Sequence, residues 1–317
     1  MKNQRFGIEI EMTGVTRTKA AQVIAEYFGT TASYSNTAKD RQGRTWSVKS
    51  DASINCQRKS NGRKVSAGNE YSVEVVSPIL VYNDIEDVQE IIRRLRKAGA
   101  FVNSSCGIHI HVDGANHTPK TLKNLINLMS QKEDILYKAL EIHPSRVRYC
   151  KKVNEGLVKL INERRPQTLR QLSDMWYNSL NASGNRNNHY NDSRYHGLNL
   201  HSTFNGQTVE FRCMNSSCHA GVVKAYIQFV LALSHQAISQ KRASSRRSVS
   251  DNEKYTMRCW LLRLGLNGEE FETCRLHLTR ALSGDSAWRH GRPEPADRTA
   301  DIACAINAHF AVMTGTA

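Results

Sequence analysis

Four short segments of the chain alternate apolar residues with residues that can bind metal ions or transfer protons. They are FGIEIEM (6–12), YSVEVVS (71–77), GIHIHVD (107–113) and TVEFRCM (208–214). Successive side chains of a β-strand point to opposite faces, so each segment predicts a strand with one apolar and one charged face. The charged faces carry Glu9, Glu11, Glu74, His109, His111, Glu210 and Arg212, and Asp51 follows a fifth candidate strand at 45–49.

If these side chains share one surface, their carboxylates repel each other. The repulsion energy of two like charges ~4 Å apart is about 4 kcal/mol at an effective dielectric constant near 20. Such a cluster persists when some carboxylates stay protonated or when cations fill it. Oxygen donors with a single imidazole suit Mg²⁺ or Mn²⁺ better than Zn²⁺. Each motif alone is common on a wet sheet face or in a surface ion pair, but their joint occurrence on strands predicts a metal-dependent site.

The elements that position these residues are predicted from periodicity and from signals at element ends. Helices are predicted at 19–28, 84–99, from 118 onward, within 151–180 and at 220–240. Asp84 and Thr118 are the expected N-caps of the second and third helices. Strands at 194–202 and 207–217 are expected to form a hairpin through Asn205-Gly206, since Asn-Gly favours tight turns. Strands mixed with helices and a hairpin favour an α+β fold with a mainly antiparallel sheet.

The composition of the 317-residue chain is that of a globular protein with a formal net charge of +15. This charge fits either a nucleic-acid partner or a basic surface suited to ATP and acidic substrates. The eight cysteines form no C-x-x-C pair, and no segment approaches the ~20 apolar residues of a membrane helix. Neither a glycine-rich dinucleotide fingerprint nor a P-loop is present. With no visible signal peptide, we expect a cytoplasmic protein with free thiols and no membrane partner.

Taken in chain order, these segments resemble the putative amidoligase family of the glutamine synthetase and glutamate–cysteine ligase superfamily. The resemblance covers about residues 5 to 217 through FGIEIEM, WSVKSDAS, YSVEVVSP, CGIHIHVD, RYHGLNLHS and TVEFRCMN. It implies a glutamine-synthetase-like curved, mainly antiparallel sheet in the shape of a half-funnel, with helices packed on its outer face. We expect a catalytic domain at 1–240 and a helical C-terminal extension at 241–317 packed on it.

The activity that the resemblance implies is an ATP- and Mg²⁺-dependent carboxylate–amine ligase, which forms an amide through an acyl phosphate. ATP and two or three Mg²⁺ or Mn²⁺ ions are the implied cofactors. The implied metal ligands form two sets, Glu11, Asp51 and Glu74 in one and Glu9, His109 and Glu210 in the other. His111 and Arg212 would contact the phosphates of ATP, and Arg194 would face a phosphate or the substrate carboxylate, so these three residues are assigned to catalysis. The base is not assigned by the resemblance; an acidic residue of the 181–193 loop, such as Asp192, is one suggestion.

Two other functions stay open at this point. A metal-dependent hydrolase with His109 and His111 as ligands would leave Glu-x-Glu and Glu-x-Arg unexplained, and the chain has no H-E-x-x-H. A nucleic-acid-binding protein is favoured by the charge alone. The carboxylate and the amine can belong to a peptide, a protein or a nucleic acid, and homo-oligomer formation is also open. We expect Glu210→Ala to abolish activity without loss of stability, because a carboxylate among like charges stabilises little.

Overall fold

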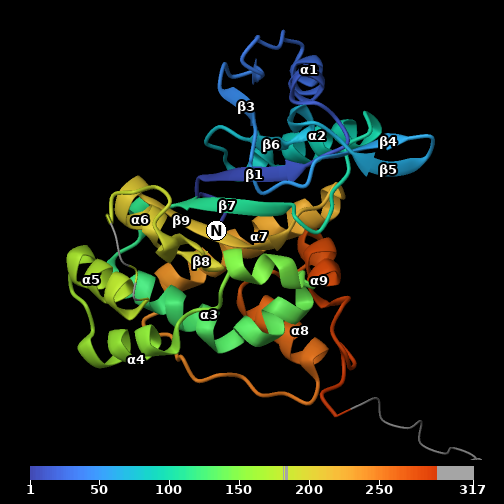
Figure 1. Ribbon diagram of the computed structural model, residues 1–317. Helices are drawn as coiled ribbons and strands as arrows, with labels where there is room; N and C mark the ends of the chain where they lie inside the picture. Colours follow the sequence, from blue (N-terminus) through green and yellow to red (C-terminus); the bar gives the residue numbers. More distant parts are fainter. Residues whose placement is uncertain (181, 183–184, 291–317) are drawn as a thin grey trace, which may run out of the picture.

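A seven-stranded antiparallel sheet lies at the centre of the protein (Figure 1). The computed structural model describes residues 1–180, 182 and 185–290. The strand order is β2-β3-β6-β1-β7-β9-β8, and every neighbouring pair is antiparallel. The strands are β1 (Phe6–Met12), β2 (Thr37–Lys39), β3 (Thr45–Lys49), β6 (Val73–Val76), β7 (Gly107–Asp113), β8 (Leu198–Asn199) and β9 (Thr208–Asn215). The prediction of an α+β fold with an antiparallel sheet is confirmed.

Helices cover one face of this sheet. Helix α1 (Arg17–Phe28) packs on β2, β3 and β6, and α7 (Ala220–Ser239) packs on β7 and on α2 (Ile85–Lys97). The apolar members of the alternating strands are buried beneath them, as Ile8 and Ile110 show with 1% and 0% exposure. The alternation predicted from the sequence therefore places the charged members of the same strands on the opposite face.

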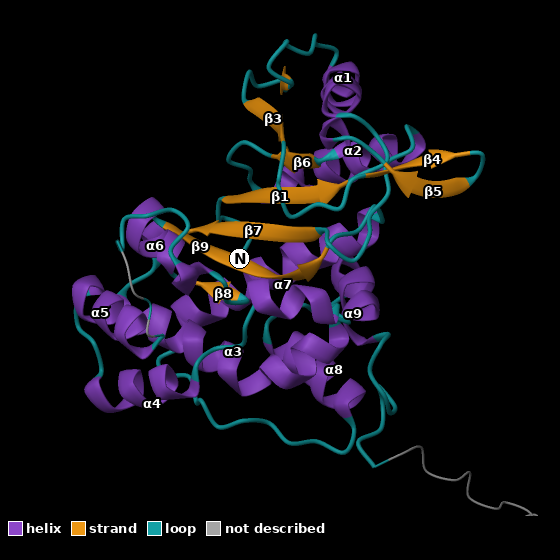
Figure 2. Cartoon of the chain, viewed as in Figure 1, coloured by secondary structure: helices purple, strands orange, loops and turns teal. Residues whose placement is uncertain are grey.

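A second group of helices contacts α7 through α3 and α9 and extends away from the sheet (Figure 1). It comprises α3 (Pro119–Ala139), α4 (Glu155–Arg164), α5 (Leu169–Ser179), α8 (Glu253–Arg263) and α9 (Glu272–Thr279). Short 3₁₀ turns also join the elements, and those in the described residues are η1 (Asn69–Tyr71), η2 (Tyr82–Asp84), η3 (Gly114–Asn116), η4 (Pro144–Tyr149), η5 (Asp192–Arg194) and η6 (Glu269–Phe271). A separate hairpin of β4 (Gln57–Ser60) and β5 (Arg63–Ser66) projects from one side (Figure 2).

The described part of the region after α7 packs on the rest of the chain through α8 and α9. Helix α9 contacts α7, and α8 contacts α3. Residues 291–317 of the predicted C-terminal extension lie outside the described residues. Within the residues that the structure describes, no helix combines the length and the apolar character needed to cross a membrane.

Most predicted helix ends are confirmed, and their capping groups explain them. Thr16 accepts a hydrogen bond from the backbone of Lys19, and Gly29 ends α1 with a φ of 71°. Thr118 caps α3 in the same way, directly before Pro119. Hydroxyl caps satisfy backbone N–H groups that have no partner inside the helix, and a left-handed glycine carries no Cβ penalty.

Two local predictions are wrong. Strands β8 and β9 do pair, but helix α6 (His201–Gly206) connects them instead of a tight Asn-Gly turn. The hydroxyls of Ser202 and Thr203 donate to the carbonyl of Thr208 at 2.8 and 3.0 Å, and these bonds fix the helical turn against β9. Asp84 does not cap α2, because its carboxylate accepts from the backbone of Val81 and from the guanidinium of Arg44.

Glu133 supplies a prediction for the pH dependence of stability. Its carboxylate in α3 is 2% exposed and accepts from the backbone of Val153 at 2.9 and 3.0 Å. Burial raises the pKa of Glu133 from 4.5 to about 7, although the bond from Val153 lowers it in part. The unfolded chain therefore binds fewer protons than the folded chain between these values, and stability falls as the pH rises from about 4.5 to about 7.

Glu133→Gln should remove this loss, because the amide oxygen can still accept from Val153. We expect the variant to be more stable than the wild type at pH 8 by about 1–3 kcal/mol, since one pKa unit corresponds to about 1.36 kcal/mol. Urea denaturation at pH 5 and pH 8 measures the difference. A variant that is less stable at pH 8 would show that the ionised carboxylate contributes to stability.

Candidate active site

The register of the sheet brings the charged side chains together. Glu9 of β1 lies opposite His109 of β7, and His111 of β7 lies opposite Glu210 of β9. On the other side of β1, Glu11 lies opposite Glu74 of β6. Directly opposed residues on antiparallel strands have Cβ atoms only about 4.5–5.5 Å apart. Four strands thus place one continuous group of ionisable side chains on the face that the helices leave uncovered.

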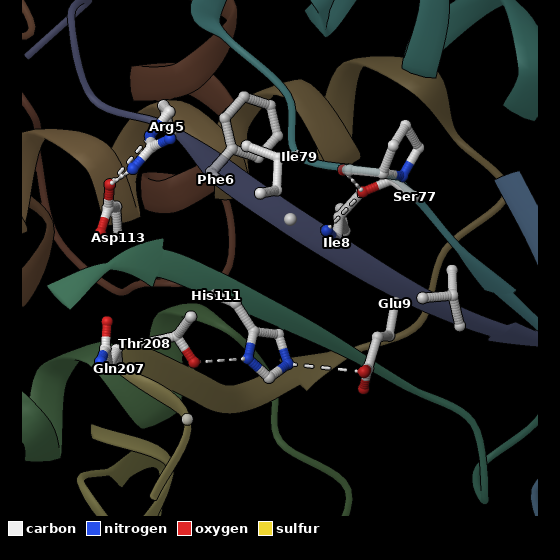
Figure 3. Close-up of a pocket in the computed structure, with 14 residues that line it drawn as sticks. Arg5, Phe6, Ile8, Glu9, Ser77, Ile79, His111, Asp113, Gln207 and Thr208 are labelled. Carbon is white, nitrogen blue, oxygen red and sulfur yellow. Dashed lines mark hydrogen bonds and ion pairs between the residues drawn. The ribbon is translucent and has the colours of Figure 1, made fainter. Parts of the chain in front are cut away.

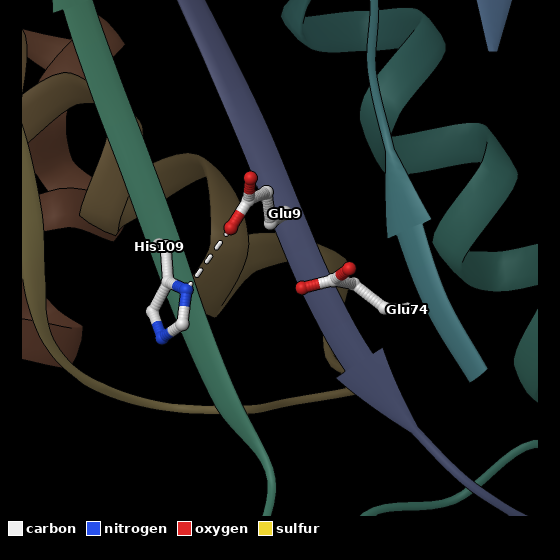
Figure 4. A group of neighbouring side chains, drawn as sticks. All are labelled: Glu9, Glu74 and His109. Carbon is white, nitrogen blue, oxygen red and sulfur yellow. Dashed lines mark hydrogen bonds and ion pairs between the residues drawn. The ribbon is translucent and has the colours of Figure 1, made fainter. Parts of the chain in front are cut away.

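Glu9 lies near the centre of this group. One oxygen of Glu9 is 3.1 Å from Nδ1 of His109, and the other is 3.5 Å from Nε2 of His111. Figure 4 shows Glu9 on β1 between His109 and Glu74. These three residues offer ligand atoms that all lie within 4.8 Å of one another, and so do Glu9, His111 and Glu210. Glu9 therefore belongs to two groups of side chains that could hold a metal ion.

Glu210 lies at the buried end of the group. Its side chain is 3% exposed, and its Oε1 is 3.9 Å from Nδ1 of His109 and 3.8 Å from Nε2 of His111. Arg212 donates to Oε1 of Glu210, and Asn199 of β8 donates to Oε2 at 2.5 Å. The predicted set of Glu9, His109 and Glu210 therefore meets around the ring of His109, and its role as a metal site stays a prediction.

The pairing of β9 with β7 is irregular at Arg212. Ile110 pairs with Phe211 but Ile108 pairs with Met214, so two residues of β9 oppose the single residue His109. Such a bulge bends the strand and redirects a side chain, and bulges are common next to active sites. The backbone N–H of Arg212 donates to Gly197 at 2.8 Å instead of to β7.

The third group contains only carboxylates. Glu11, Asp51 and Glu74 offer oxygen atoms that lie within 4.8 Å of one another. The backbone N–H of Gly107 donates to Glu11 at 2.6 Å, and the carboxylate of Asp51 accepts from the backbone of Ser53 at 2.7 Å. These bonds fix the orientation of two of the three carboxylates. The residues of this group are those predicted as the first metal site.

The pKa values divide the cluster into two parts. Burial raises the pKa of Glu210, but Arg212 and the two histidines outweigh it and bring the value down to about 2. The pKa of Glu9 is also lowered, because hydrogen bonds and charge interactions with His109 and His111 exceed the opposing effect of burial. In contrast, burial raises the pKa of Glu74, which Glu9, Glu11 and Asp51 raise further, to about 8. The all-carboxylate part thus retains a proton at neutral pH.

Glu74→Gln should stabilise the metal-free protein at pH 9. A pKa of about 8 in the folded state means that the contribution of Glu74 to stability is lost as the pH rises from 4.5 to about 8. At pH 9 the carboxylate is ionised and repels its neighbours, whereas the amide is neutral. We expect a higher melting temperature for the variant at pH 9 without metal and a smaller stabilisation by added Mg²⁺. A lower melting temperature at pH 9 would contradict the assigned repulsion.

All members of the cluster except Glu11 line a polar cavity of about 600 Å³. Arg194, predicted to face a phosphate or a carboxylate, also lines it and donates to the carbonyl of His189 at 3.1 Å. Asp192, suggested as a base, is exposed and does not line this cavity. An adjoining cavity of about 350 Å³ has more apolar walls, which include Phe6 and Ile79. Figure 3 shows the ring of His111 in that cavity, between Thr208 and Glu9.

Several residues of the site were not predicted from the sequence. Asn199 bonds directly to Glu210, and Arg146 lies buried beneath Arg212, donating to its carbonyl at 3.3 Å. His189 and His201 line the polar cavity from the segment after α5. The composition of that segment, rich in Asn and His, was the only available signal, because its contacts depend on the packing of α5 on α6 and of α6 on β9.

The fold and the site define an α+β protein that gathers carboxylates, imidazoles and an arginine on the open face of an antiparallel sheet. Residues 2–234 match the model of the family described as putative amidoligase enzyme. The chain belongs to this family, which makes it a ligase-type enzyme with carboxylate and amine substrates, and the predicted family assignment is confirmed. No curated protein matches the chain.

Proposed function

We propose that the protein is an ATP- and Mg²⁺-dependent carboxylate–amine ligase that forms an amide bond through an acyl phosphate. The observation that carries this proposal is the meeting of a carboxylate-rich group and the Glu210–Arg212 pair in one cavity, in a member of the amidoligase family. The proposal includes the half-funnel shape of the sheet and a cytoplasmic location. All seven cysteines in the described part of the chain are free thiols, as is usual in a reducing compartment.

The residues present fit divalent ions and phosphate groups. A cation among Glu11, Asp51 and Glu74 would relieve the repulsion that raises the pKa of Glu74. Hard oxygen donors are the ligands that Mg²⁺ and Mn²⁺ prefer. The buried Nε of Arg212 has no hydrogen-bond partner among the described residues. Arg212 lines the same cavity, and a guanidinium N–H suits the oxygen atoms of a phosphate.

The reaction divides into two displacements. When bound, ATP supplies the phosphoryl group and divalent ions neutralise its charge during transfer. A carboxylate oxygen of the substrate forms the new bond to phosphorus as the bond to ADP breaks. The amine nitrogen then forms the bond to the acyl carbon, phosphate leaves, and the amine gives up a proton. Arg212 is held by Glu210, and its remaining N–H groups would stabilise the charge that develops on the phosphoryl group.

Metal selectivity tests the proposal directly. In the presence of a non-hydrolysable ATP analogue, we expect calorimetry to detect two or three Mg²⁺ or Mn²⁺ ions per chain. Phosphate release from ATP should require one of these ions together with a carboxylate and an amine. Tight binding of Zn²⁺ alone, with no binding of Mg²⁺ or Mn²⁺ beside the analogue, would contradict the ligase and favour a hydrolase that uses His109 and His111.

The carboxylate is proposed to belong to an acidic or macromolecular partner. Arg194 lies at the polar cavity, packed over the ring of Tyr190 at 5.3 Å, and a guanidinium matches a carboxylate with two parallel bonds. The surrounding residues are polar and the chain is strongly basic. In the same phosphate-release assay, efficient turnover of free glutamate with ammonia would contradict this choice of substrate.

A further inference from the structure

A separate hollow, called here the basic hollow, lies on the helical part of the protein. It has a volume of about 710 Å³ and shares no lining residue with the two cavities described above. Those two lie beside the proposed metal ligands, called here the metal-ligand cluster, which are Glu9, Glu11, Asp51, Glu74, His109 and Glu210. Three segments form its walls, which are the start of α3, the turn between α4 and α5, and the chain after α7. The proposed ligase activity assigns no role to it.

Five basic side chains and no acidic side chain line this hollow, from Lys120, Lys123, Arg165, Lys241 and Arg242. None of the five forms an ion pair with any described residue. Elsewhere the basic residues of the chain often have partners: Arg44 pairs with Asp40 and Asp84. Burial lowers the pKa of Lys123, and the neighbouring charges of Arg165, Arg242 and Lys120 lower it further. The positive charges are therefore close enough to repel each other.

The backbone of this region is held in place before any ligand binds. Asn124 is 1% exposed, donates to the carbonyls of Ala237 and Gln240 and accepts from the backbone of Ala243. Asn127 donates to the carbonyl of Ala243 at 3.0 Å. These bonds fix the chain that carries Lys241 and Arg242 against α3. A site with a fixed backbone loses less entropy when it binds.

Arg165 occupies an unfavourable backbone conformation at this hollow. It ends α4 with a φ of 48°, a left-handed position at which glycine is the common residue. A non-glycine residue is disfavoured there because its Cβ approaches the following carbonyl. Glycine would remove that strain, but it would also remove one of the five charges.

We propose that this hollow binds a compact anion with closely spaced phosphate groups, such as an oligophosphate chain. Each phosphate group concentrates negative charge and several acceptor oxygens in a small volume, and five cations around one hollow match that density. The volume suits a small ligand. Five cations gathered around one hollow favour such a compact ligand over an extended nucleic acid, whose charge is spread along its length.

Calorimetry with inorganic tripolyphosphate in EDTA tests this site. Without divalent ions, the carboxylates of the metal-ligand cluster disfavour an anion there, so binding reports on the basic hollow. We expect one site per chain, with an affinity that falls as salt is added. The double variant Lys241→Gln/Arg242→Gln should bind at least 10-fold more weakly. The control Lys19→Gln/Arg63→Gln removes the same charge from exposed positions outside the hollow and should stay within about twofold of the wild type.

Arg165→Gly separates binding from folding. The variant should melt no lower than the wild type, because glycine relieves the left-handed strain, yet it should bind tripolyphosphate several-fold more weakly. An unchanged affinity for tripolyphosphate in both hollow variants would contradict binding at this site. An equal loss of affinity in the control variant would contradict it too. If a 20-nucleotide RNA or DNA binds more tightly than tripolyphosphate, and this binding also depends on Lys241 and Arg242, the proposal of a compact ligand is wrong and the site binds nucleic acid.

Discussion

Replacing Glu210 by alanine is expected to abolish ATP-dependent phosphate release and to lower the melting temperature of the metal-free protein. The loss of activity should be about 10³-fold or more, because the variant loses both a proposed metal ligand and the group that orients Arg212. Steady-state phosphate release at saturating Mg²⁺ measures this effect. Wild-type turnover in the variant would remove Glu210 from the mechanism.

The expected loss of stability reverses the expectation from the sequence. Glu210 and Arg212 are 3% and 7% exposed in their side chains, so alanine would leave a buried guanidinium without its anion. Breaking a buried pair by removing one partner typically destabilises a protein by about 3–5 kcal/mol. The pKa of about 2 supports the same sign, since a lowered value means that Glu210 contributes stability above pH 4.5 and loses it as the pH falls toward 2.

Two further variants distinguish chemistry from folding. Glu210→Gln keeps an oxygen that can accept from Arg212, so it should recover part of the lost stability but little activity, because a neutral amide is a poor metal ligand. Glu133→Gln changes another buried carboxylate, in α3, and should leave turnover unchanged. A normal rate for Glu210→Gln would show that only the shape of the side chain matters at this position.

The polar face of the sheet could be predicted because alternation is a local property. A period of two in 6–12 and 107–113 determines which side chains share a face, whatever the neighbouring strands are. The structure adds the register, which pairs Glu9 with His109 and Glu11 with Glu74. The register depends on long-range packing, and a shift of one residue would have moved these side chains to the apolar face.

Residue types alone could not predict whether the pKa of each carboxylate is raised or lowered. Glu74 and Glu210 are both glutamates on alternating strands, yet their pKa values are about 8 and about 2. The difference arises because Glu74 faces other carboxylates, whereas Glu210 faces Arg212. The sequence could predict a charged cluster but not which of its members stabilise the fold.

Arg212→Lys is expected to lower turnover by about 10²-fold while changing the affinity for ATP much less. Lysine keeps the positive charge but has a single ammonium group in place of a planar fork of five N–H donors. In the structure one part of that fork donates to Glu210, and Nε has no partner among the residues that the structure describes. A lysine that satisfies Glu210 therefore has no second oriented donor for the transferring phosphoryl group. Loss of one such donor costs about 3 kcal/mol in the transition state.

The comparison with Arg44→Lys decides whether this donor acts in catalysis. Arg44 also donates to two carboxylates, Asp40 and Asp84, but it lies outside the cavity of the metal-ligand cluster. Its replacement should lower stability and leave turnover unchanged. If Arg212 only holds Glu210 in place, then Arg212→Lys should behave like Arg44→Lys. The alternative result is a fall in kcat with little change in the KM for ATP and a near-normal melting temperature. This result would show that Arg212 stabilises the transition state, because lysine preserves the ion pair that folding requires and removes the donor that phosphoryl transfer requires.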